Sequence, residues 1–473
     1  MELDKTTTSC KGEGAALLAG LPDYPYGTPD PVLYSCGYAL WERADEQSRM
    51  RMYTDTDSAE FERWCETVLR LGWERVFLRE KDGNRFADFR SAEGQRCYAY
   101  YLTQNGTSGT VRIIADRSGT APEDFCYRTE PSDSSRFYLF NMNYECEDTY
   151  LIRLSDGGWI VLDGGVCNYA GVDPEEGFAD ALYDFMRERG EPTANGEVRI
   201  ACWYLTHAHR DHFLAFQRLI ERHHREIRLE RVMANLPDWS VVDHNTNLPW
   251  FAICMERIRE FYPSVLWLKP HTGMQIRLAD AEFDILFTQE DHLDFWVANH
   301  DRYHSVWKHF RKLDPEDPQW EIRHQLCKQY DINNTSMVSR ITVAGLSVLE
   351  MGDAFRANEW IIPYWSIDTL RTDIVKTAHH FLNNELLPFY QALARDGKPM
   401  IFLMNLLNRP MIPEKKQWLE GLPAGQHFLP ASSKTIYGFS RDGTGAVRTE
   451  AIPASYSWYS MVAEAPQKRI EGE

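Results

Sequence analysis

The chain has 473 residues, of which 43% are hydrophobic and 26% charged, a composition that excludes wholesale disorder, a collagen-like repeat and a small disulfide scaffold. At about 150 residues per domain, this length predicts two or three domains. The 51 basic and 70 acidic residues give a formal charge of −19, which disfavours nucleic acid as a partner because the surface repels a polyanion. We therefore expect a small-molecule substrate.

The sequence shows neither a membrane-spanning segment nor a secretory signal, which bears on where the protein is expected in the cell. No run of about 18 apolar residues is present of the kind that spans a membrane, and the polar first twelve residues do not resemble a secretory signal. The ten cysteines are scattered without a C-x-x-C pair, so we interpret them as small buried hydrophobes rather than disulfides or thiolate ligands. We expect a cytoplasmic protein with no membrane partner.

The first part of the chain predicts a small α+β module. Residues 1 to about 50 are rich in Pro, Gly, Tyr and Asp and resemble an irregular arm, and apolar residues recur at helical spacing within 58–71. The residues that this amphipathic helix would bury are Phe61, Trp64, Val68 and Leu71. Short strands are expected at 73–78, 96–103 and 110–116, separated by turn-forming segments. We predict an accessory module at 1–125, acting as a lid or as the oligomerisation element of a homodimer.

Residues 136–473 predict a larger layered domain. Strand patterns alternate with helical ones such as 177–189, which favours an α/β or α+β arrangement. The expected strands lie at 137–140, 150–154, 159–162, 198–205 and 346–351. Residues 295–330 are basic and helical in pattern and interrupt the strands like an insertion. This insertion either covers the domain as a helical hairpin or forms a basic wall beside a pocket.

The densest polar motif follows the strand expected at 198–205 and has the sequence Thr-His-Ala-His-Arg-Asp-His over 206–212. Side chains two apart on an extended segment point the same way, so His207 and His209 can bind one ion. Where the chain turns into the next helix, Asp211 and His212 project together and can bind a second ion. Four metal-capable side chains in six positions after a buried strand rarely occur by accident.

This H-x-H-x-D-H motif resembles the metallo-β-lactamase superfamily, whose fold is an αββα sandwich of two sheets between two helix layers. The likeness extends over roughly 137–454 and includes Ile-Val-Leu-Asp-Gly-Gly at 160–165. There it implies that Asp163 supports the ligand loop without binding an ion itself. It also includes Asp353, directly after an apolar strand, and the pair His379-His380 after 374–378.

By this resemblance Asp353 bridges two ions, because each of its two oxygens can meet one cation. His380 completes the second site, and His379 faces the substrate as a proton donor or oxyanion partner. The implied ligands are His207, His209, Asp211, His212, Asp353 and His380. The implied cofactors are two divalent metal ions, with zinc expected from the mixed nitrogen and oxygen donors and manganese or iron as alternatives.

One segment departs from the common pattern of the superfamily. Most members supply a further histidine to the first ion just before the strand that leads to the bridging aspartate, and this chain has Asp-Ile-Asn-Asn-Thr-Ser at 331–336. This segment is similar to a subset that includes the DNA-uptake competence-type domains and bacterial phosphorylcholine esterase domains. Asn334 could bind weakly through its carbonyl or leave room for a water. The alternative is a distant histidine, namely His244, His271 or His304.

The expected activity is metal-dependent hydrolysis, in which a hydroxide shared by two cations attacks the substrate. Asp211 and His379 would be the catalytic residues. A small phosphodiester is the leading substrate, because both similar subgroups act on phosphodiesters. A lactone, ester or thioester hydrolase of the same fold is the alternative. A non-catalytic metal-binding scaffold is a third interpretation, disfavoured because the motif residues are all present.

Overall fold

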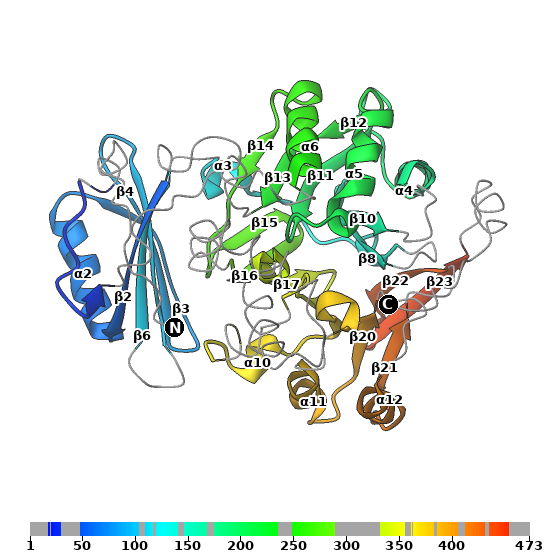
Figure 1. The fold of residues 1–473 in the computed structure, drawn as a ribbon. Coiled ribbons are helices and arrows are strands. Elements are labelled where there is room, and N and C mark those ends of the chain that lie inside the picture. The colour runs from blue at the N-terminus through cyan, green and yellow to red at the C-terminus, as the bar shows by residue number, and fades with distance from the viewer. Residues whose placement is uncertain are drawn as a thin grey trace, which may run out of the picture.

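The computed structural model describes residues 18, 20–29, 48–103, 109–116, 120–140, 146–167, 175–234, 248–288, 332–354, 361, 363–382, 386–404, 412–430 and 435–453. The predicted insertion at 295–330 and most of the N-terminal arm lie outside these residues. The described chain forms three sheets with flanking helices, an α+β fold (Figure 1). No helix in this part of the chain is long and apolar enough to cross a membrane.

The first sheet has six strands and carries one helix, α2 (Ser58–Arg70), on one face (Figure 1). In spatial order the strands are β1 (Thr28–Pro29), β2 (Ser48–Thr56), β6 (Gly109–Asp116), β5 (Arg96–Leu102), β4 (Asn84–Arg90) and β3 (Glu74–Lys81). Helix α2 begins at a capping box in which the side chains of Asp57 and Glu60 satisfy each other's backbone N–H groups. It buries Phe61, Trp64 and Val68 as predicted.

Two details of this region differ from the sequence prediction. Leu71 is 58% exposed rather than buried, because the helix ends at Arg70 and the helical periodicity ends with it. Strand β4 was not predicted, although the turn before it was. Asp82 and Gly83 have φ values of 53° and 77°, which suits the two-residue turn that joins a tight hairpin. Most of β4 is buried, because α2 covers one face of the sheet and the main body of the protein covers the other.

The second face of this sheet packs onto the rest of the molecule. Phe86 stacks on Trp365 with ring centroids 5.9 Å apart, and the Tyr98 hydroxyl donates to the Thr272 carbonyl over 2.9 Å. Arg79 and Lys81 both pair with Asp284, at 2.8 and 2.9 Å. The N-terminal sheet therefore shares its core with the main body.

The main body contains the other two sheets. One has nine strands, mostly in the order β14 (Leu266–Leu268), β13 (Arg231–Ala234), β11 (Val198–Leu205), β10 (Trp159–Cys167), β9 (Cys146–Arg153), β8 (Arg136–Leu139), β22 (Thr435–Arg441) and β23 (Val447–Pro453), with β12 (Ile227–Leu229) beside β11. The other has eight, in the order β21 (Gln426–Pro430), β20 (Met400–Met404), β19 (Ile374–Lys376), β18 (Leu346–Glu350), β17 (Val338–Val343), β16 (Ala281–Phe287), β15 (Gln275–Ala279) and β7 (Tyr127–Arg128).

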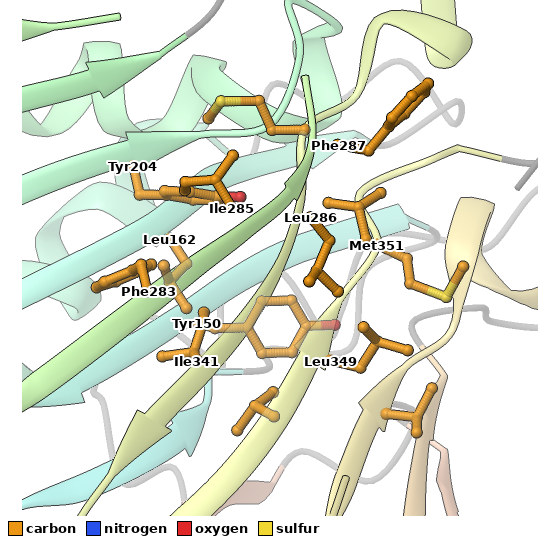
Figure 2. Close-up of a cluster of buried hydrophobic side chains, with 14 of the residues drawn as sticks. Tyr150, Leu162, Tyr204, Phe283, Ile285, Leu286, Phe287, Ile341, Leu349 and Met351 are labelled. Atoms are coloured by element: carbon orange, nitrogen blue, oxygen red, sulfur yellow. The ribbon is translucent and has the colours of Figure 1, made fainter. Parts of the chain in front are cut away.

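A shared hydrophobic core lies between these two sheets. Figure 2 shows Tyr150, Leu162 and Tyr204 of the nine-stranded sheet together with Phe283 and Ile341 of the eight-stranded sheet. A second core lies on the outer face of the nine-stranded sheet, under three helices. These helices are α4 (Glu175–Arg189), α5 (Arg210–His223) and α6 (Leu248–Phe261).

Further helices pack against the eight-stranded sheet. They are α10 (Ile367–Leu370), α11 (Leu387–Ala394) and α12 (Pro413–Glu420), and a short helix α3 (Pro122–Phe125) precedes β7. Trp418 of α12 meets Phe402 of β20 edge to face, with centroids 5.2 Å apart. Strands β10, β11, β13 and β14 run parallel, as do β18, β19, β20 and β21. The carboxyl ends of β11, β18 and β19 carry the polar residues described next.

Candidate metal centre

The histidine motif begins where β11 leaves the core. All but one of the residues of β11 are buried, so the strand is held on both faces and its end is fixed in place. Helix α5 starts at Arg210, with His209 as its N-terminal cap residue. The change from strand to helix turns successive side chains of the motif in different directions, so that its histidines face two groups of partners.

The first cluster consists of His207, His209 and Asp353, whose ligand atoms all lie within 4.8 Å of one another. His207 Nε2 is 3.1 Å from His209 Nδ1 and 3.9 Å from Asp353 Oδ2. His207 is fully buried, and burial holds its pKa well below the usual value. Its imidazole is therefore neutral, which is the form that binds a metal ion.

The second cluster consists of Asp148, His212, Asp353 and His380, all buried and also with ligand atoms within 4.8 Å of one another. His212 Nε2 lies 3.2 Å from Asp353 Oδ2 and 3.3 Å from Asp148 Oδ2. His380 Nδ1 lies 3.3 Å from the same oxygen of Asp148. Neither His212 Nε2 nor His380 Nδ1 makes a hydrogen bond within the described part of the chain. Both nitrogens nevertheless lie close to carboxylate oxygens, which is the arrangement expected of ligand atoms around a single cation.

Asp353 belongs to both clusters, and its two oxygens have different surroundings. Oδ2 faces three histidine nitrogens, at 3.9 Å for His207, 3.2 Å for His212 and 3.7 Å for His380. Oδ1 lies 3.3 Å from Lys376 Nζ. One oxygen, Oδ2, therefore faces the histidines of both clusters, and the other lies against a lysine. The expectation that each oxygen serves one ion stays a prediction.

Asp163 hydrogen-bonds two residues of the histidine motif. Its side chain accepts hydrogen bonds from the Thr206 backbone N–H at 2.7 Å and from His212 Nδ1 at 2.7 Å. Because a carboxylate only accepts, Nδ1 of His212 carries a proton, and Nε2 faces the second cluster. Burial alone would lower the pKa of His212, but the facing Asp353 and Asp163 raise it well above the usual value, so a cation bound at Nε2 would displace a proton there. Asp163 itself has a φ of 56°, a left-handed conformation that Asp adopts more readily than most residues.

The His379-His380 pair lies in an unusual turn after β19. His379, His380 and Phe381 have φ values of 50°, 52° and 66°, and such left-handed residues cost on the order of 1–3 kcal/mol each. The turn is held by Lys415, whose Nζ donates to the Phe381 carbonyl over 2.5 Å. The Tyr390 hydroxyl also accepts from the Ala378 N–H over 2.9 Å. The turn directs His380 into the second cluster.

Two sequence-predicted residues lie beside the clusters rather than in them. Asp211 is not a member of either group, and its Oδ2 is 3.1 Å from His380 Nε2. His379 is half-buried, and its Nε2 is 3.2 Å from Asn333 Nδ2. Burial alone would raise the pKa of Asp211, but the hydrogen bond from His380 holds it well below the usual value. Asp211 therefore stays ionised beside His380, and its expected roles as a metal ligand and a catalytic residue stay predictions.

The asparagine that contacts the first cluster is Asn333. Its Oδ1 is 3.0 Å from His207 Nε2, whereas the sequence analysis offered Asn334 as a weak ligand among several alternatives. Both lie in a 3₁₀ turn at Ile332–Thr335, in which successive side chains point about 120° apart. Only one of two neighbours can therefore point at His207. A role for Asn334, which is also buried, stays a prediction.

The distant histidines offered as substitutes do not complete the first cluster among the described residues. His271 is buried elsewhere and stacks on Tyr98 with centroids 5.5 Å apart. His244 and His304 lie outside the described residues. His244 and His304 therefore stay predictions, and among the described residues the amide of Asn333 lies against His207.

Two residues of the site were missed by the sequence analysis. Asp148 precedes the apolar part of β9, and Lys376 ends the apolar strand β19. Both are buried, and their side chains are 3.0 Å apart. A charged residue inside or beside an otherwise apolar strand was the signal available, since lysine and aspartate are rarely buried unless paired.

The donor set fits a pair of divalent cations. Histidine nitrogens and carboxylate oxygens converge from the ends of β11, β18 and β19 and from within β9. His212 and His380 direct nitrogens without hydrogen bonds toward the second cluster. Burial alone would raise the pKa of Asp353, but the facing His212 and His380 hold it well below its usual range. Such a mixed nitrogen and oxygen set suits zinc and tolerates iron or manganese.

The chain matches no protein-family model and no curated protein. Among solved structures, it is similar to CmlA, a diiron beta-hydroxylase from Streptomyces venezuelae. That match has 12% sequence identity and a TM-score of 0.30, and it covers 80% of this chain and 76% of CmlA.

Proposed function

We propose that this protein is a dinuclear metal-dependent hydrolase of the metallo-β-lactamase type. The observation that carries the proposal is the pair of clusters that share one oxygen of Asp353. One aspartate common to two histidine groups is the arrangement that two neighbouring cations require. The face-to-face sheets, with helices packed against both, support the same fold type.

Two cations in these clusters would supply positive charge to a substrate oxygen and lower the pKa of a coordinated water. In the proposed ligand set, His207, His209 and Asp353 hold one ion. His212, His380, Asp148 and Asp353 hold the other, and Asp211 keeps His380 in orientation.

We propose His379 as the residue that acts on the substrate. It is half-buried rather than buried and follows β19 directly beside His380. Its contact with Asn333 Nδ2, at 3.2 Å, fixes the ring next to the first cluster. The Asn333 amide N–H is a donor aimed at Nε2. We propose that His379 stabilises a developing oxyanion or protonates the leaving group.

A small phosphodiester is the substrate that we propose. The resemblance at Asn333-Asn334 and His379-His380 supports this class, and the charge of a phosphate matches two cations. The formal charge of −19 favours a small substrate over a long nucleic acid. Zinc is the metal that we propose, with manganese or iron as alternatives.

The test is metal analysis of the purified protein, followed by turnover of reporter substrates. We expect about two divalent ions per chain and cleavage of bis-p-nitrophenyl phosphate, with both lost in Asp353→Ala. Cleavage of lactone or thioester reporters alone would contradict the substrate class and leave the metal centre intact. Metal bound without turnover of any reporter would favour a non-catalytic scaffold. A protein that binds no divalent metal would contradict the whole proposal.

A further inference from the structure

Lys376 lies at the centre of the candidate metal site and takes no part in the proposed hydrolysis. It is the last residue of β19 and is 1% exposed. Its Nζ lies 3.0 Å from Asp148 Oδ2, 3.3 Å from Asp353 Oδ1 and 2.5 Å from the Gly352 carbonyl oxygen. A buried ammonium group is costly unless it is paired. Here both of its charged partners are candidate metal ligands.

The two contacts have different geometric consequences. On Asp353, the lysine contacts Oδ1, and Oδ2 is the atom that faces the histidines of both clusters. On Asp148, the lysine contacts Oδ2, the same oxygen that lies 3.3 Å from both His212 Nε2 and His380 Nδ1. An ion in the second cluster and the ammonium of Lys376 would therefore draw on one oxygen.

We propose that Lys376 is a resident counter-cation of the metal centre, which competes with the second-cluster ion for Asp148 and turns Asp353 so that Oδ2 faces both clusters. It is a positioning residue, because it touches the ligands and not the substrate. The inference rests on the proposed metal binding. It goes further in assigning to the protein a third, permanent positive charge at the site.

This role makes a prediction that a merely structural lysine would not satisfy. Without metal, Lys376 pairs with both Asp148 and Asp353, and His212 and His380 face the same two carboxylates. The lysine is the group in this set whose charge does not depend on a histidine proton, so its loss leaves the two buried carboxylates with less positive charge beside them. With metal bound, the ions supply the missing charge. Removal of the lysine should therefore destabilise the metal-free protein more than the metal-loaded protein. By linkage, the folded Lys376 variant then binds metal more tightly than wild type does.

The experiment compares Lys376→Met, Lys376→Gln and wild type in the full chain. Thermal unfolding is followed in excess EDTA and in saturating Zn²⁺, and zinc affinity is measured by competition with a chromophoric chelator. For both variants we expect Tm to fall more in EDTA than in zinc. We also expect the dissociation constant of the tighter site to decrease about tenfold, a change of about 1.4 kcal/mol. Lys376→Gln keeps hydrogen-bond donors without charge and tests the charge itself.

Lys269→Met is the matched control, because Lys269 is equally buried, at 3% exposed, on the loop after β14 and outside both clusters. It should lower Tm equally with and without zinc. The proposal is overturned if the Lys376 variants lose equal stability in both conditions, if zinc binds more weakly, or if Lys376→Gln behaves as wild type. If Lys376→Met folds only in zinc, the proposal is supported. Failure of wild type to bind zinc would instead contradict the proposed function.

Discussion

Replacement of Asp163 by Asn tests whether the metal centre depends on the carboxylate that orients His212. Asn has nearly the same size and tolerates the observed φ of 56°. Its side-chain oxygen can still accept the hydrogen bond that the Thr206 N–H donates to Asp163 Oδ1 over 2.7 Å in the wild type. Its NH₂ group, however, would meet the Nδ1–H of His212. In the wild type this group donates to Asp163 Oδ2 over 2.7 Å. Two donors would then face each other in a buried site.

The energetic consequence follows from this clash. His212 can restore the hydrogen bond only by moving its proton to Nε2, the nitrogen that faces Asp353 and Asp148. A protonated Nε2 cannot bind a cation, so we expect metal affinity of the second cluster to fall about 10- to 100-fold. Loss of a hydrogen bond to a charged group should also lower the free energy of unfolding by about 1.5–3 kcal/mol.

The assay is zinc titration against a chromophoric chelator, with chemical unfolding measured in parallel. Thr206→Val is the control for the second cluster. It removes the Thr206 hydroxyl bonds to Asp163 and the hydroxyl contact with His207 Nδ1, and it leaves the contact of Asp163 with His212 intact. We expect this control to lose stability of about 1 kcal/mol with little change in the zinc affinity of the second cluster. Wild-type zinc affinity in Asp163→Asn would refute the assignment of the His212 proton to Nδ1.

Three further predictions concern the metals, the substrate and the interface of the N-terminal sheet. Mild chelation should remove the two ions in two phases. The first-cluster ion should leave first, because three residues hold it and four hold the other. A metal-sensitive dye measures the release, and release in a single phase would contradict this prediction. His379→Ala should reduce kcat while metal content by elemental analysis stays at the wild-type value, and a loss of metal would show that His379 is a ligand. Burial alone would raise the pKa of Asp284, but the charges of Arg79 and Lys81 hold it below the usual value. The ion pairs of Asp284 with Arg79 and Lys81 therefore stabilise the fold fully above the unfolded-state pKa of about 4, and this stabilisation is lost as the pH falls through the lower folded-state pKa. Asp284→Asn should lower the free energy of unfolding by about 1–3 kcal/mol at pH 7 and by progressively less in acid. Urea unfolding at several pH values measures this difference.

The local elements of the fold were largely predictable from the sequence. The helix at 58–70 and the strand at 198–205 follow from their spacing of apolar residues, which depends only on neighbours along the chain. Strand β4 was missed because both of its faces are covered, so it lacks the alternation that marks a strand with one exposed face. The end of α2 before Leu71 was missed for a related reason, since the terminal residue of a helix depends on its cap geometry.

The metal motif was predictable because its residues are close in sequence. His207, His209 and His212 follow one strand, and the strand fixes their separation before any tertiary contact forms. The sequence also placed Asp353 and His380 at the ends of other strands. It could not decide which oxygen of Asp353 faces the ions, because this depends on a lysine 23 positions away.

Tertiary structure alone decided the rest of the site. Asp148 and Lys376 come from different sheets, and only the packing of one sheet on the other brings their side chains to 3.0 Å. The choice of Asn333 over Asn334 depends on the rotation of a single 3₁₀ turn. The sequence by itself therefore determined which chemistry the strand ends can carry. The packing of the two sheets decided which charges meet there, because burial makes an unpaired charge too costly and forces each one to find a partner across the interface.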